Sequence, residues 1–418
     1  MSIPSAHLLA VAAGAAHAAR RGPVASLTRR SSARVSCGAT ASDEGATLPW
    51  ALAARERAGT PVNLADAAGY KRLVERLAGG IIASATPASA ETLFPGAPGV
   101  GGAEALGFAH GTAGVLWALC ETGAHVPDAL ADWLVDATHR MPHAGAGLAD
   151  GYAGLALTLD ALGRSADAAW LWRAVEETPL DELGVTLADG LAGLGLALLE
   201  RAPIPDAEAL LAKVDEIAGA LVERLAERPR LDRLGLSRGG AGVALFLLHM
   251  YDLTEDPALL RPIEDCLRHD LALLGWKSFG RHAALPLWTR PGSLENGSIG
   301  VAIVLRQAQQ HLDAPWVAEA AEELTAAAER WLLAHPGLSH GRAGTVLALQ
   351  YLRSHPWETP EERFVRVCPY LEPLTVHADA RADAAAEMSM GLEDGVAGVL
   401  LALGHLGRAG ERRVPFFW

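Results

Sequence analysis

Short apolar runs recur along this chain at intervals of 39 to 58 residues, each directly after a pair of glycines. Two of these runs, residues 115–119 and 243–248, carry no polar side chain on any side, which is typical of a helix buried all round. Between the runs, apolar residues return at steps of three and four, as along 130–141 and 210–225. This spacing predicts amphipathic helices with one buried face. No comparable period-two run predicts a strand, so we expect an all-α protein.

The glycine pairs belong to one motif, a polar residue followed by Gly-x-x-Gly, and this motif is repeated along the chain. The first glycines of its seven copies are Gly111, Gly151, Gly190, Gly239, Gly297, Gly341 and Gly395. The interval between copies accommodates two helices and their connections, so each repeat pairs a buried inner helix with an amphipathic outer one. Because the inner helices have no face suited to water, a closed ring is favoured over an open superhelix. The sequence therefore predicts a double-layered α/α toroid, a barrel of seven helix-pair repeats.

The polar residues that precede the first glycines are candidates for a functional site. They are His110, Asp150, Asp189, Arg238, Asn296, His340 and Asp394. In a closed ring the glycine corners gather at one mouth, where the inner helices begin with unpaired N–H groups and the positive ends of their dipoles. We expect these seven side chains to project into that mouth. For Asp and Asn the alternative is a capping role, since both are favoured N-caps, but capping does not account for the His and Arg residues.

Composition narrows the class of partner. The chain has 418 residues, 50% of them hydrophobic, and a formal net charge of −14, which argues against nucleic acid or an anionic membrane as the main partner. No apolar run reaches the ~20 residues that a membrane helix needs. The four cysteines, Cys37, Cys120, Cys266 and Cys368, lie too far apart for a zinc signature or a disulfide framework. We therefore expect a cytoplasmic protein.

Two serines, Ser237 and Ser339, stand in Gly-x-Ser-x-Gly stretches that match a hydrolase motif. That motif needs a strand before the serine, whereas these serines belong to the helical repeat, which argues against serine hydrolysis. The sequence also lacks the glycine-rich phosphate loop and the His-Glu-x-x-His pattern, so phosphoryl transfer and zinc-protease chemistry are not indicated.

Stretches outside the glycine motif are also distinctive. They are Ile-Ala-Ser-Ala-Thr-Pro at 82–87, Leu-Phe-Pro-Gly at 93–96, Gly-Ser at 292–293 and Pro-Phe-Phe at 415–417. Together with the repeats, they make the chain resemble the lanthionine synthetase C-like cyclases, above all the C-terminal cyclase domain of class III lanthipeptide synthetases. The resemblance covers about residues 70–418. It implies a partly disordered leader of unknown role at 1–70 and a cyclase domain at 71–418.

The resemblance also implies a reaction and partners. Full-length synthetases of that class carry a lyase and a kinase-like domain upstream of the cyclase, and this chain shows neither. Either separate kinase and lyase proteins dehydrate the precursor peptide, or the chain is part of a longer one. The implied step is the intramolecular addition of a peptide Cys thiol to dehydroalanine or dehydrobutyrine. This carbon–sulfur bond closes a thioether ring.

The zinc-dependent members of that family hold the metal with two Cys and one His. The matching positions here are Glu295, Ser339 and His340, so only the His is retained. A carboxylate and a serine hydroxyl are poor substitutes for two thiolates at a soft zinc site. We therefore expect no zinc and no other cofactor.

Without a metal, activation of the thiol falls to histidine, because a free Cys with a pKa near 8.5 is only a few per cent thiolate at neutral pH. We expect His340 to act as the base and His110 as the acid that returns a proton to carbon. Arg238 is expected to stabilise the enolate, and Asp150 or Asp189 to orient an imidazole. Further residues are expected to line the cavity: Asn296, Asp394, Glu295, Ser339 and Tyr152. For Tyr152 the alternative is packing, and Glu393 is interpreted as part of an acidic rim.

Two rival functions remain open from the sequence. One is a non-catalytic, degenerate cyclase scaffold that binds the precursor peptide and a partner kinase or lyase. The other is a glycan-active α/α-toroid enzyme, which needs two carboxylates roughly 5–9 Å apart in an aromatic cleft. Aromatic residues make up only 6% of this chain and do not recur at the motif, which disfavours the glycan-active enzyme.

Overall fold

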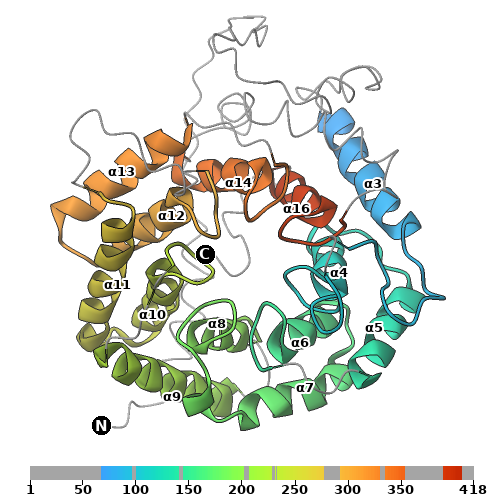
Figure 1. Cartoon of the computed structure of the whole chain (residues 1–418), viewed down its shortest axis with the longest axis horizontal. Helices are drawn as coiled ribbons and strands as arrows, with labels where there is room; N and C mark the ends of the chain where they lie inside the picture. Colours follow the sequence, from blue (N-terminus) through green and yellow to red (C-terminus); the bar gives the residue numbers. More distant parts are fainter. Residues whose placement is uncertain are drawn as a thin grey trace, which may run out of the picture.

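In the computed structural model, the helices form two concentric rings (Figure 1). The residues that the structure describes are 67–96, 100–140, 145–201, 207–227, 231, 233–276, 292–329, 335–353 and 389–406. The predicted leader at 1–70 lies outside this part of the chain, apart from its last four residues. Within the described residues no strand occurs, and no helix is long and apolar enough to cross a membrane.

The inner ring is built from the helices that follow the glycine motifs. They are α4 (Thr112–Glu121), α6 (Tyr152–Ala161), α8 (Leu191–Arg201), α10 (Gly240–Thr254), α12 (Ser298–Ala308), α14 (Arg342–Arg353) and α16 (Val396–Leu406). Each packs against the next, and α16 packs against α4, so the ring closes (Figure 1). The predicted α/α toroid is therefore confirmed.

The outer ring is built from the amphipathic helices. They are α5 (Asp128–Arg140), α7 (Ser165–Glu177), α9 (Ala207–Ala226), α11 (Leu260–Leu273) and α13 (Pro315–Glu329), with two short 3-10 helices, η1 (Leu180–Glu182) and η2 (Pro257–Leu259). Helix α3 (Ala67–Ala83) packs against α16, so the first described helix covers the last inner one. The predicted domain boundary at residue 70 falls inside α3.

The hydrophobic core fills the space between the two rings. Trp172 of outer helix α7 and Phe246 of inner helix α10 are among its largest fully buried side chains. Inner helices are enclosed by outer helices on one side and by each other on the rest, which is why their sequences need no polar face. The predicted alternation of buried and amphipathic helices is the direct result.

A ring of backbone hydrogen bonds closes the barrel at the glycine corners. In every corner, the residue two places before the first glycine donates its N–H to the carbonyl of the equivalent residue in the next repeat, over 2.8 to 3.2 Å. The seven residues, which we call the collar, are Ala109, Ala149, Ala188, Ser237, Glu295, Ser339 and Glu393. The last of them donates to the first, so the hydrogen-bonded ring has no open end.

The second glycine of the motif lets neighbouring repeats approach closely. At Gly242, an added Cβ would lie 2.9 Å from Cβ of Leu187 in the preceding repeat. At Gly114 it would lie 2.8 Å from Cβ of Leu392, across the junction between the last repeat and the first. Real Cβ atoms do not tolerate such contacts, so the glycines are needed for the ring to close.

Candidate functional site

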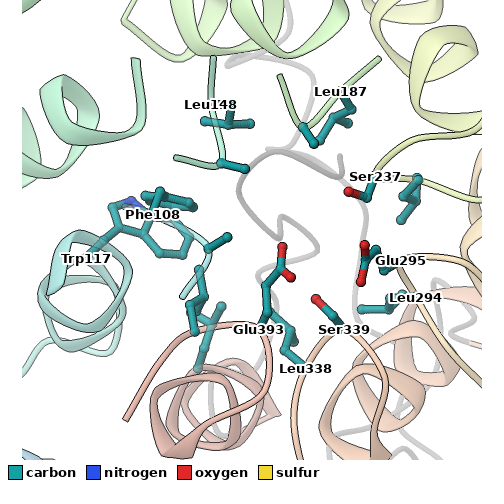
Figure 2. Close-up of a pocket in the computed structure, with 16 residues that line it drawn as sticks. Phe108, Trp117, Leu148, Leu187, Ser237, Leu294, Glu295, Leu338, Ser339 and Glu393 are labelled. Carbon is teal, nitrogen blue, oxygen red and sulfur yellow. The ribbon is translucent and has the colours of Figure 1, made fainter. Parts of the chain in front are cut away.

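The collar surrounds a cavity at the end of the barrel where the inner helices begin (Figure 2). The cavity measures about 710 Å³, open solvent at its mouth included. All seven collar residues line it, together with the seven residues that immediately precede them, Phe108, Leu148, Leu187, Leu236, Leu294, Leu338 and Leu392. Trp117 and Leu401, further along α4 and α16, complete the wall. Most of this lining is apolar.

The collar itself has two unlike halves. The first three repeats contribute only methyl groups, from Ala109, Ala149 and Ala188. The other four contribute two hydroxyls and two carboxylates, from Ser237, Glu295, Ser339 and Glu393. Figure 2 shows these four oxygen-bearing side chains facing one another across one side of the cavity. Any chemistry in the cavity is therefore confined to one arc, opposite an apolar wall.

The polar residues before the first glycines lie one position further along, and they are not among the residues that line this cavity. Each directly follows a collar residue, and the charges of Asp150 and Arg238 still act on the collar carboxyl of Glu393. That these seven side chains project into the mouth stays a prediction, and the residues that line the cavity stand one position before them. Of the predicted site residues, Glu295 and Ser339 line the cavity directly.

The capping alternative also fails where the helix starts are defined. Gly151 and Gly297 are the N-caps of α6 and α12, with extended backbone and no side-chain capping bond. Asp150 and Asn296 precede these glycines, one residue too early to cap. The side chain of Asn296 instead accepts the hydroxyl of Ser293 in the corner.

His340 is held behind the collar by two partners. Its Nε2 lies 2.7 Å from Oε2 of Glu295, and its Nδ1 lies 3.1 Å from Oγ of the buried Ser293. Burial raises the pKa of Glu295, but the hydrogen bond and charge of His340, with the charges of His110 and Arg238, outweigh it and hold that pKa below its ordinary value. This pair therefore presents an ionised carboxylate to the cavity, backed by an imidazole.

His110 forms a second, looser pair across the junction of the first and last repeats. Its Nε2 lies 3.6 Å from Oε2 of Glu393, whose side chain is 20% exposed. Burial, together with the negative charges of Glu295, Asp394 and Asp150, raises the pKa of Glu393 to about 8, against the opposing charge of Arg238. At neutral pH Glu393 is thus mainly a neutral acid, unlike Glu295.

Arg238 is bound to Asp189 and is not among the residues that line the cavity. Its Nη1 donates to Oδ2 of Asp189 at 2.6 Å, and Asp189 also accepts from Oγ1 of Thr186 at 2.5 Å. Burial raises the pKa of Asp189, but these two hydrogen bonds and the charge of Arg238 lower it overall. Arg238 acts on the collar through its charge alone, which favours the ionised form of both collar glutamates.

The remaining predicted residues have different surroundings. Burial, chiefly, raises the pKa of Asp150, and among the described residues its Oδ1 is buried without a hydrogen-bond partner. Asn296 accepts the hydroxyl of Ser293 at 3.0 Å, and Asp394 acts on Glu393 through its charge. Tyr152 packs edge-on against Trp170 of α7, with ring centroids 5.6 Å apart. It does not line the cavity, so the packing alternative holds for Tyr152.

The residues at the positions of the family's zinc ligands do not fit a zinc ion. Both ring nitrogens of His340 are engaged, one by Glu295 and one by Ser293. Ser339 offers a neutral hydroxyl where a soft metal favours a thiolate. Nowhere in the described part of the chain do three His, Cys, Asp or Glu side chains converge as a metal site.

Sequence reasoning missed Glu393 and Ser237 as cavity residues. A signal was present, because the collar position reads Ala, Ala, Ala, Ser, Glu, Ser, Glu when the seven corners are aligned. The next position along the chain varies more, and its His, Asp and Arg residues are the ones that the sequence predicts as the site. The two glutamates at an otherwise small-residue position are the signal that could have identified the collar.

A closed double ring of helices with a cavity at the helix-starting corners defines this protein as an α/α toroid. Nisin cyclase shares the fold, with a TM-score of 0.53 and 17% sequence identity over 75% of this chain and 90% of that one. Residues 189–417 match the family described as lanthionine synthetase C-like protein, and the chain belongs to this family.

A curated relative extends the match toward the N-terminus. The probable SapB synthase of Streptomyces coelicolor (strain ATCC BAA-471 / A3(2) / M145) is 37% identical over an alignment of 387 positions, which covers 87% of this chain. The aligned region is 41% of that relative, so the chain spans less than half of its length.

Proposed function

We propose that this chain is a zinc-independent lanthipeptide cyclase, which catalyses the addition of a peptide Cys thiol to dehydroalanine or dehydrobutyrine. The observation that carries the proposal is the pair of cavity-lining glutamates, Glu295 and Glu393, each backed by an imidazole from a neighbouring repeat. Their opposite pKa shifts supply one proton acceptor and one proton donor in the same cavity.

The first step is removal of the thiol proton. Glu295 faces the cavity and His340 stands behind it, so the proton is taken up by the pair rather than by either residue alone. This refines the expected role of His340, whose ring does not line the cavity. The thiolate then attacks the β-carbon of the dehydro residue and forms the C–S bond.

The second step is protonation of the resulting enolate. Seven inner helices begin around the cavity, and the positive ends of their dipoles favour the negative charge that develops there. The proton returns from the side of the collar where His110 and Glu393 lie. The apolar wall opposite excludes water, which strengthens both effects.

The substrate is a precursor peptide that already carries dehydro residues. Kinase and lyase activities must generate them, either on separate proteins or on further parts of a longer chain. The thioether ring is the product, and the reaction leaves the mass of the peptide unchanged.

Because the mass does not change, the deciding assay counts free thiols. A dehydrated, Cys-containing peptide is incubated with and without the protein, alkylated, and analysed by mass spectrometry. We expect alkylatable thiols to disappear only when the protein is present. Binding of the peptide without thiol loss would support the non-catalytic scaffold instead.

Metal independence is a separate prediction. We expect the rate of thiol loss to be unchanged after extensive treatment with a chelator, since the Glu295, Ser339 and His340 set does not fit zinc. Metal analysis of the purified protein provides the second readout. Stoichiometric zinc, or activity that disappears with the chelator and returns with added zinc, would contradict this prediction.

The glycan-active alternative has weaker support. Two carboxylates in one cavity match its basic requirement. The lining, however, is mostly aliphatic, with Phe108 and Trp117 as its aromatic residues. Sugar rings are bound preferentially against aromatic faces, and the family match favours peptide cyclisation.

A further inference from the structure

A second cavity lies beside the first and is unexplained by the function above. It is bounded by the segment around Thr92 and Phe94, by Val100 and Ala105, and by the start of α4 at Thr112. Its volume is about 450 Å³, open solvent included. We call it the side cavity. None of its lining residues lines the central cavity.

His110 connects the two cavities. The residue lines the side cavity, and its Nε2 lies 3.6 Å from the carboxylate of Glu393, which lines the central cavity. Gly391 lines the side cavity as well, and an added Cβ there would lie 2.7 Å from the carbonyl oxygen of His110. The side chains of His110 and Glu393 therefore stand between the two cavities, and both are partly exposed.

We propose that Glu393 is the catalytic acid that protonates the enolate carbon, and that His110 reloads it with a proton drawn from the side cavity. This rests on the proposed cyclase function and specifies one of its steps. His110 is then a positioning and proton-relay residue, and it does not touch the substrate.

The proton balance of the reaction is complete without a further reagent. The thiol S–H bond breaks, and its proton goes to the Glu295–His340 pair while the C–S bond forms. The O–H bond of Glu393 then breaks as the new C–H bond forms. His110 passes a proton to Glu393, a proton enters through the side cavity, and the Glu295–His340 pair releases its proton to solvent.

The charges around Glu393 favour this role. Glu295, Asp394 and Asp150 face it with negative charge, and Arg238 is the opposing cation. Together with burial, they raise the pKa of Glu393 to about 8, so the acid form is available at neutral pH. Glu295, on the other side of Ser339, is ionised. Two carboxyls whose environments separate their pKa values are the usual arrangement of an acid and a base.

The first test is Glu393→Gln in the full chain, assayed on a synthetic peptide with one dehydroalanine and one Cys. We expect ring formation to slow by about 100-fold, the ordinary contribution of a general acid. The stereochemistry at the newly protonated carbon gives a second readout. Wild type is expected to give one diastereomer, and the variant a mixture, because solvent then protonates either face of the enolate.

A matched control variant distinguishes the loss of the catalytic acid from a structural effect of the substitution. Glu177→Gln changes an exposed glutamate on outer helix α7 and is expected to leave rate and stereochemistry unchanged. A folded Glu393→Gln protein that keeps the wild-type rate, or that slows while still giving one diastereomer, would overturn the proposal. Absence of cyclisation by wild type would instead reject the function itself.

The second test is independent of the first and applies even if Glu393→Gln fails to fold. His110→Ala removes the imidazole from the wall of the side cavity, and added imidazole is expected to restore its rate about tenfold or more, since it can occupy the space left. His340→Ala serves as the comparison without rescue, because its ring does not line the side cavity. If added imidazole does not raise the rate of a folded His110→Ala protein, the side cavity is not part of the proton pathway.

Discussion

Replacing His340 with Asn is expected to slow thioether formation by two to four orders of magnitude near neutral pH. The imidazole Nε2 lies 2.7 Å from Glu295, the ionised carboxylate that faces the cavity. Without the imidazole, the proton taken from the thiol has no basic group to receive it, and Glu295 alone is too weak a base for a thiol. The measurement is the initial rate of thiol loss on the dehydrated peptide.

The partner residue provides an internal check on this prediction. If Glu295 and His340 act as one unit, Glu295→Gln combined with His340→Asn is expected to be little slower than either change alone. His125→Asn, at an exposed position in the loop after α4, is the control and is expected to leave the rate unchanged. Retention of more than about a tenth of the wild-type rate by a folded His340→Asn protein would reject the pair as the base.

Replacing Asp270 with Ala is expected to lower the free energy of unfolding by about 3–5 kcal/mol. This buried carboxylate on outer helix α11 accepts three backbone N–H groups. Two come from Gly240 at 2.8 Å and Ala241 at 2.9 Å, at the start of inner helix α10, and one comes from Gly235 at 2.9 Å, in the corner before it. Alanine leaves all three donors buried without a partner. Denaturant unfolding at neutral pH measures the loss.

An acidic residue on the same helix provides the control. Asp265 is exposed and pairs only with Arg261 one turn away, so Asp265→Ala is expected to change stability by less than about 0.5 kcal/mol. Equal losses for the two variants would show that the three hydrogen bonds do not matter.

Asp270 also predicts a pH dependence of stability. Burial, opposed by the three hydrogen bonds, raises its pKa from 3.8 to about 6 in the folded protein. The folded state therefore binds this proton more tightly than the unfolded chain. The part of the stability that comes from binding this proton is full below about pH 4 and lost as the pH rises through about 6, while the three hydrogen bonds to the carboxylate remain at neutral pH. The stability difference between wild type and Asp270→Asn is expected to narrow over that interval, and a widening difference would contradict the assignment.

The candidate site could be predicted only in part from the sequence. The polar position next to Gly111 and Gly341 pointed correctly to the glycine corners, but the side chains that reach the cavity belong to the residue before it. A repeated sequence reveals which positions recur. It does not reveal which way a turn directs each side chain, because that depends on the backbone bonds the corner makes with its neighbours.

The sequence by itself determined the helices, their alternation between buried and amphipathic, and the number of repeats, because these follow from local periodicity and from glycine placement. It also indicated the family, through the resemblance carried by stretches such as 82–87 and 93–96. Only the tertiary structure decided that Glu393 meets His110 and that Glu295 meets His340. Glu295 and His340 belong to consecutive repeats and meet because α12 packs against α14, whereas Glu393 and His110 meet only because α16 closes the ring against α4. The raised pKa of Glu393 has the same origin, since burial and the convergence of several carboxylates exist only once the ring has formed.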